Sequence, residues 1–124
     1  MTEPTVVSVR DCYRRIQLLD TLGVEKDRVR LVVNRYSNQA FVSEADIQRN
    51  LGISVAGVIA DDKRTVLQAT NEGRLIRELN RKSEVIRDIA SLVAILTDDV
   101  EADTRENYRD DSKSGFLFGL FNRG

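Results

Sequence analysis

The sequence predicts an α/β fold in which about two parallel strands, flanked by helices, form part of a doubly wound sheet. Two short apolar runs, at residues 29–33 and 53–60, have the length and β-branched content of strands buried on both faces. Segments with helical spacing precede, separate and follow these runs. Such alternation favours parallel strands joined by right-handed crossovers. We expect this α/β domain to span residues 1–97.

The composition is that of a globular protein with a polar surface, with 124 residues, 41% hydrophobic and 31% charged. Histidine is absent, which excludes Ser-His-Asp triads, Cys-His pairs and histidine-based metal sites. A net charge of -1 gives no general attraction to nucleic acid, so we expect no nucleic-acid partner. Cys12 is the single cysteine, and neither a signal peptide nor an apolar run of roughly 20 residues is recognisable. These features predict a cytoplasmic location.

The first helix is predicted to begin after Pro4, which favours an extended chain before it, and to be capped by Thr5. Its apolar positions recur at helical spacing, and Gly23 is expected to end it. The residues of this apolar stripe are Val9, Cys12, Tyr13, Ile16 and Leu19.

Three further helices are predicted from caps and stops. Ser43 is expected to cap a short helix that ends at Gly52, and another short helix ends at Gly73. Ser83 is expected to cap a long final helix. The apolar face of that helix is predicted to contain Val85, Ile86, Ile89, Ala90, Val93 and Leu96.

Polar pairs follow both predicted strands, where ligands bind in open α/β sheets. Asn34-Arg35 follows the first strand and either contacts a ligand or begins a loop. Asp61-Asp62 follows the second strand and either binds a cation, acts as an acid–base pair, or caps the next helix. Two strands alone leave sheet edges without neighbours, so we also expect a homodimer or a separate partner chain.

In order and spacing, several segments resemble the carboxyl-terminal half of the ParA/MinD class of P-loop ATPases, and most closely the CpaE/TadZ proteins of pilus assembly. The resemblance covers about residues 2–97. The matching segments are Thr2–Thr5, Ser8–Arg10, Arg28–Arg35, Ile59–Asp62, Val66–Ala69 and Asn71–Gly73.

The resemblance implies an adenine-binding edge. Asn34 would contact the adenine of ATP, because an amide donates and accepts hydrogen bonds in one plane, and Arg35 would flank it. Asp61 and Asp62 would line the base pocket, although Ala60 stands where the family usually has proline. The turn around Pro4 would close the other side of the base.

The family's phosphate-binding motif, Gly-x-x-x-x-Gly-Lys-Ser/Thr, is absent from these 124 residues. We therefore expect no catalytic residue, no metal site and no cofactor held by this chain alone, with ATP possible by resemblance. The expected role is localisation or assembly of a pilus or secretion machine, with components of that machine as partners. One alternative is an ATPase half that supplies the adenine pocket to a P-loop-bearing partner chain. Another is a membrane-tethered adaptor without nucleotide binding. The chain is expected to be either a fragment or a stand-alone remnant.

Charge divides the remaining sequence into two parts. Residues 98–113 hold three basic and seven acidic side chains and are predicted to form a flexible tether. Residues 114–124 are predicted to form an amphipathic tip, with Phe116, Leu117, Leu120 and Phe121 on one face. This surface would dock on protein, or lie peripherally at the inner face of the membrane, where the acidic tether would oppose anionic lipid.

Overall fold

The computed structural model describes residues 1–98. The predictions for the tip residues Phe116, Leu117, Leu120 and Phe121, and for all but the first residue of the tether, lie outside this range. The chain divides into a compact unit, Met1–Leu92, and a second unit, Val93–Gly124. The packing described below is that of the first unit. Among the described residues, no helix is long and apolar enough to cross a membrane.

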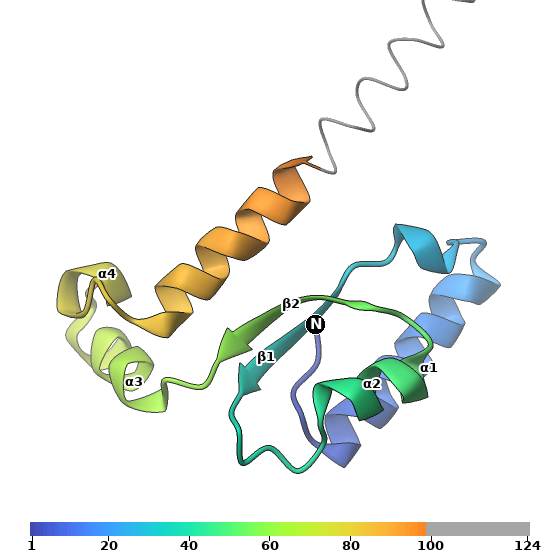
Figure 1. The fold of residues 1–124 in the computed structure, drawn as a ribbon, viewed down its shortest axis with the longest axis horizontal. Helices are drawn as coiled ribbons and strands as arrows, with labels where there is room; N and C mark the ends of the chain where they lie inside the picture. Colours follow the sequence, from blue (N-terminus) through green and yellow to red (C-terminus); the bar gives the residue numbers. More distant parts are fainter. Residues whose placement is uncertain (99–124) are drawn as a thin grey trace, which may run out of the picture. The chain divides into compact units, whose positions relative to one another are not determined.

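The elements alternate as the sequence predicts, and the α/β class is confirmed (Figure 1). A final helix occupies residues 84–98. The elements before it are α1 (Val6–Thr21), the 3-10 helix η1 (Lys26–Arg28), β1 (Leu31–Tyr36), α2 (Glu44–Leu51), β2 (Val55–Ala60), α3 (Lys63–Glu72) and α4 (Ile76–Leu79).

The sheet consists of β1 and β2 in parallel, as predicted. Thr2 forms an isolated parallel bridge with Val33. In this bridge the Thr2 N–H donates to the Val32 carbonyl at 2.9 Å, and the Asn34 N–H donates to the Thr2 carbonyl at 2.8 Å. Because backbone groups alternate in direction along a strand, these bonds lie on the edge of β1 opposite β2. β1 therefore has a neighbour on each side.

Two apolar clusters cover the two faces of β1. Leu31 and Val33 belong to the cluster that contains α1 and α2, which lie together beside the strand pair in Figure 1. Val32 belongs to the other cluster, with Ile59 of β2 and Val85 of the final helix. Leu31, Val32 and Val33 are only 2%, 7% and 0% exposed, so the prediction of a strand buried on both faces is confirmed for β1.

The same prediction is wrong for most of β2. Ile59 alone is buried in this strand, and its other residues are half-buried. The physical reason is its place in the sheet, because β2 has a strand neighbour only on the side of β1. At one point the final helix covers the other side, where the Asp88 carboxylate accepts a hydrogen bond from the Ala60 N–H at 3.0 Å.

The predicted helix caps are confirmed at the first two helices. The Thr5 side chain accepts a hydrogen bond from the Ser8 N–H, and the Ser43 side chain accepts one from the Asp46 N–H. Ser83 behaves differently, because its buried hydroxyl donates to the Asp62 carboxylate at 3.1 Å. It therefore ties the start of the final helix to the start of α3.

The apolar face predicted for the final helix is only partly buried. Val85 is buried and Leu92, which the prediction omitted, packs against the same cluster. Ile89 is 42% exposed. The buried stripe of this helix thus runs through residues 85 and 92. Ile89, on the predicted apolar face, is left partly exposed.

Candidate ligand site at the carboxyl ends of the strands

The backbone of β1 is irregular close to its carboxyl end. Asn34 and Arg35 were predicted to follow the strand, but both lie within it, because β1 continues to Tyr36. Val33 pairs with Val58 and Tyr36 pairs with Ala60, so β1 has one residue more than β2 between these pairs. The extra residue is accommodated by the backbone of Arg35, which has φ 56°. This left-handed conformation costs a residue with a side chain about 1–2 kcal/mol. Irregularities of this kind are common next to functional sites.

The Arg35 guanidinium joins three segments of the chain. Its Nε lies 3.4 Å from Asp61 Oδ1, after β2, and its Nη1 lies 3.5 Å from Glu3 Oε1, in the N-terminal segment. The charge of Glu3, and then the hydrogen bond and charge of Asp61, raise the pKa of Arg35. All three side chains remain between 31% and 49% exposed, so the cluster is accessible to a ligand.

The N-terminal segment reaches this cluster through the bridge of Thr2 to β1. Pro4 is buried, and the Thr5 N–H donates to the Glu3 carbonyl at 2.8 Å, which closes a tight turn around the proline. The structure therefore places the Glu3-Pro4 turn, Arg35 and Asp61 at one end of the sheet. Asn34 is held there by its backbone bond to Thr2, and its half-buried carboxamide makes no hydrogen bond to residues 1–98.

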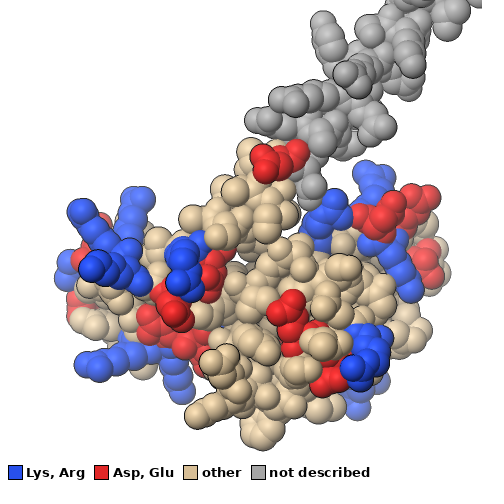
Figure 2. All heavy atoms as spheres, in the orientation of Figure 1, with Lys and Arg blue, Asp and Glu red and all other residues tan. Residues whose placement is uncertain are grey.

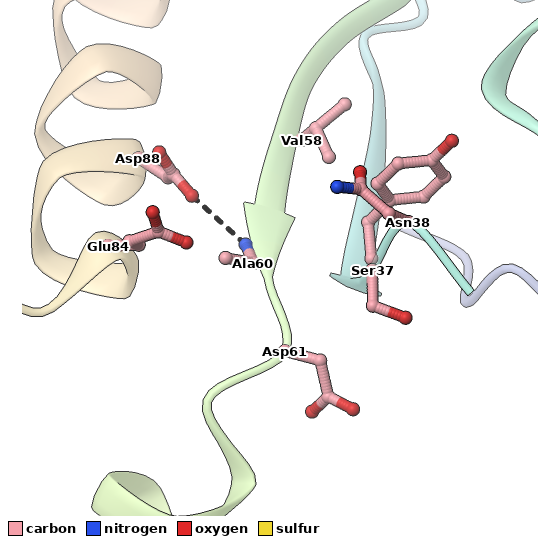
Figure 3. Close-up of a pocket in the computed structure, with 8 residues that line it drawn as sticks. Ser37, Asn38, Val58, Ala60, Asp61, Glu84 and Asp88 are labelled. Carbon is pink, nitrogen blue, oxygen red and sulfur yellow. Dashed lines mark hydrogen bonds between the residues drawn. The ribbon is translucent and has the colours of Figure 1, made fainter. Parts of the chain in front are cut away.

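A cavity of about 450 Å³ opens at the carboxyl ends of the strands (Figure 3). Its volume is within the range of about 300–1,000 Å³ typical of small-molecule sites. Figure 3 shows Glu84 and Asp88 of the final helix on one side of the end of β2, and Ser37 and Asn38 on the other. The cavity is lined by Tyr36, Ser37, Asn38, Val58, Ala60, Asp61, Glu84 and Asp88.

The cavity combines an aromatic ring and aliphatic carbon with several hydrogen-bonding groups. Tyr36 and Val58 supply apolar surface, and Asn38 supplies an amide with both a donor and an acceptor. The lining contains three carboxylates and no cation, although Arg35 lies against one of them, Asp61. Such a lining suits a planar, neutral group with N–H donors better than it suits an anion. Asn34 does not line this cavity.

The two adjacent carboxylates predicted as a pair have separate surroundings. Asp61 faces Arg35 and the cavity, whereas Asp62 caps α3 by accepting a hydrogen bond from the Thr65 N–H at 3.1 Å. Hydrogen bonds from Thr65, and then from Ser83, lower the pKa of Asp62. In the described part of the chain, no group of three or more His, Cys, Asp or Glu side chains is arranged to hold a metal ion.

Sequence reasoning missed six residues of the cavity: Tyr36, Ser37, Asn38, Val58, Glu84 and Asp88. One of them carried a usable signal. Asp88 follows Val85 by three residues and precedes Leu92 by four, so helical geometry places this carboxylate among the buried residues of its helix. A carboxylate in that position must find a donor, and it finds the Ala60 N–H.

No protein-family model matches the chain. Its curated relatives are named for division-site placement. It is 36% identical over 86 residues to the putative septum site-determining protein MinD of Guillardia theta. The matched stretch covers 64% of this chain and 31% of that protein. It is 32% identical over 78 residues to the chloroplastic septum site-determining protein minD homolog of Arabidopsis thaliana, with coverages of 59% and 23%. The chain thus spans about a third or less of the length of these relatives.

Solved structures agree with these relatives. A chain of the MinC:MinD cell division protein complex from Aquifex aeolicus is 26% identical, with a TM-score of 0.67, over 77% of this chain and 40% of that one. A ParA family ATPase from Chlorobium tepidum has the same fold, with a TM-score of 0.63 at 17% identity over 77% of this chain and 38% of that one. The names are those of MinD and ParA proteins and do not support the pilus-assembly branch in particular. In sequence and fold, the chain is therefore similar to part of the MinD and ParA proteins, which belong to the P-loop ATPases.

Proposed function

We propose that this chain provides the base-binding edge of a MinD-like nucleotide site and serves in the spatial placement of a cell-division assembly. The observation that carries the proposal is the cavity at the carboxyl ends of β1 and β2, with the Glu3-Pro4 turn and Arg35 at the same end of the sheet. Asn34, Arg35, Pro4, Asp61 and Asp62 remain the residues that the family resemblance assigns to the base. In this proposal, Tyr36 and Asn38 join them as residues that line the cavity.

The chemistry of the lining favours a base over a phosphate. The cavity contains Asp61, Glu84 and Asp88, and three carboxylates repel a phosphate group. An adenine ring offers an exocyclic N–H₂ group and ring nitrogens, which match carboxylate acceptors and the amide of Asn38. The phosphates would then require a P-loop, and these 124 residues contain no such motif. The chain alone would therefore bind a nucleotide weakly and would not hydrolyse it.

The biological role follows from the relatives. Their names refer to septum-site determination and cell division, which favours placement of a division assembly over placement of a pilus or secretion machine. A CpaE/TadZ-like role in pilus assembly belongs to the same superfamily and would use the same base edge. In either role, the chain would act with a P-loop-bearing partner or with a second copy of itself.

Calorimetry with ATP and magnesium tests nucleotide binding directly. We expect weak binding that is retained with adenosine, because the base supplies most of the contacts, and lost with GTP. Asn38→Ala, which removes an amide from the lining of the cavity, is expected to weaken binding at least threefold. Asn71→Ala, on the exposed side of α3 and away from the cavity, is the matched control and should leave binding unchanged.

Two results would contradict the proposal. If no adenine compound produces a heat of binding, this chain does not bind the nucleotide. Equal binding of ATP and GTP, unaffected by Asn38→Ala, would place the nucleotide elsewhere on the surface.

A further inference from the structure

A second, more apolar groove lies in the part of the chain that follows β2. It has a volume of about 680 Å³ and is formed by α3, α4 and the start of the final helix. Val66, Leu75 and Ile86 contribute apolar surface, and Arg74 and Arg77 line it as well. Val66 and Leu75 are 39% and 52% exposed, so the groove leaves apolar side chains uncovered in the first unit.

The groove lies in the most basic stretch of the chain. Residues 63–82 contain six basic and two acidic side chains, a net charge of +4 in a protein whose total is -1. Figure 2 shows Lys and Arg side chains over the end that carries α3 and α4. Arg74 pairs with Glu72 at 3.4 Å and with Glu78 at 3.8 Å. Arg77 and Arg81 make no ion pair within residues 1–98, so their charges are available to an acidic partner.

The chain itself contains a segment with the complementary chemistry. Residues 98–113 carry a net charge of -4, equal and opposite to that of residues 63–82. Large apolar residues follow directly, among them Phe116, Leu117, Leu120 and Phe121. An apolar groove with basic residues on its rim binds an acidic segment with apolar anchors through burial of the anchors and attraction of the rim.

We propose that the α3–α4 groove binds the acidic, phenylalanine-rich segment 98–121 of a second copy of this chain. Exchange of this segment between two copies fills both grooves at once and closes as a symmetric pair. The acidic residues lie against Arg77 and Arg81, and Phe or Leu side chains enter the groove beside Val66, Leu75 and Ile86. This pairing requires no nucleotide, so it is independent of the function proposed above.

Sedimentation velocity of the full chain at low and high salt tests the pairing. We expect a concentration-dependent dimer whose dissociation constant rises at least tenfold in Arg77→Glu/Arg81→Glu and in Phe116→Ser/Phe121→Ser. Added salt weakens the dimer, because the contacts of the rim are exposed. Arg10→Glu/Arg15→Glu, on the exposed face of α1, makes the same change in net charge and should leave the dimer intact.

A charge exchange separates this interface from other modes of association. Asp110→Lys/Asp111→Lys brings the net charge of residues 98–113 from -4 to 0, and Arg77→Glu/Arg81→Glu brings that of residues 63–82 from +4 to 0. Each variant alone should be monomeric, and a mixture of the two should form a heterodimer, because the unchanged acidic segment of one variant then meets the unchanged basic groove of the other. Circular dichroism of each variant establishes that it is folded.

Three results would overturn the proposal. A wild-type chain that stays monomeric at every concentration excludes the second copy. A dimer that survives both the groove and the segment substitutions uses another surface. Failure of the segment variant and the groove variant to associate on mixing shows that the segment and the groove do not meet.

Discussion

Arg35 carries two properties that rarely occur together in a strand. Its backbone has φ 56°, and its guanidinium contacts carboxylates from two segments that are distant in sequence. Exposed ion pairs contribute about 0–1 kcal/mol each, which is similar in size to the cost of the left-handed backbone. The arginine therefore adds little net stability, and its position is better explained by the joining of the Glu3 turn to the end of β2.

Substitution of Arg35 separates the two effects. Arg35→Gly removes both the ion pairs and the cost of the left-handed backbone. Arg35→Ala removes the ion pairs but keeps that backbone cost. We expect Arg35→Gly to be more stable than Arg35→Ala by about 1 kcal/mol in urea unfolding, because only glycine adopts this φ without cost. Equal stability of the two variants would show that the backbone at this position relaxes.

Asp62 gives the folded state a defined dependence on pH. Its pKa is lowered in the folded state by hydrogen bonds from Thr65 and Ser83, so its contribution is present above its ordinary pKa and is lost as pH falls through the lower folded value. We expect Asp62→Ala to lower the free energy of unfolding at pH 7 by about 1 kcal/mol, the usual value of a helix cap. Urea unfolding between pH 7 and pH 2 measures the change.

The matched control is Asp62→Asn, which keeps an acceptor for the Thr65 N–H but cannot titrate. The difference between wild type and Asp62→Ala should shrink as the medium becomes acid. Asp62→Asn should be close to wild type at pH 7 and should lack the part of the pH dependence due to this group. A difference between wild type and Asp62→Ala that is the same at pH 7 and pH 2 would contradict the assignment.

At the scale of elements, the contact between β2 and the final helix is close at Gly57. A Cβ at this position would lie 3.0 Å from Leu92 Cδ1. We expect Gly57→Val to lower the free energy of unfolding by about 1–3 kcal/mol, because the added methyl groups overpack this contact. Leu92→Ala should recover part of the loss in the double variant, which a double-mutant cycle in urea measures. Strict additivity of the two substitutions would mean that the helix does not pack on Gly57.

Local patterns predicted most of the elements. The apolar run before Asn34, the caps at Thr5 and Ser43, and the glycine stops correspond to what the structure has. Each of these signals depends on a few neighbouring residues. The extra residue at Arg35 has no such signal, because it follows from the register between two strands, and periodicity along one strand does not contain that register.

The candidate site was predicted less completely for the same reason. Asn34, Arg35 and Asp61 were found because they follow apolar runs, and Pro4 through the resemblance. The bond from Ala60 to Asp88 spans 28 residues, and the pair of Arg35 and Glu3 spans 32. Such contacts depend on how the helices pack against the sheet. The second strand was expected to be buried because its sequence is apolar, and its place beside a single strand neighbour left it half-buried.

At the scale of the molecule, opposite charges are separated along the chain. The strand ends carry an acidic cavity, whereas α3, α4 and the connection after them carry a net charge of +4. The separation agrees with the two ligands proposed above: a base with hydrogen-bond donors at the first surface, and an acidic segment with apolar anchors at the second. If both proposals hold, one chain binds a nucleotide base and a protein segment at separate surfaces.

The central claim is that the carboxyl ends of β1 and β2 bind an adenine base. The most direct test is a titration of the ¹⁵N-labelled full chain with adenosine, followed by the shifts of backbone amide resonances. We expect the largest shifts at Tyr36, Asn38, Ala60 and Asp61, with smaller shifts at Glu84 and Asp88 across the cavity. Shifts confined to α3 and α4, or no shifts at millimolar adenosine, would contradict the claim.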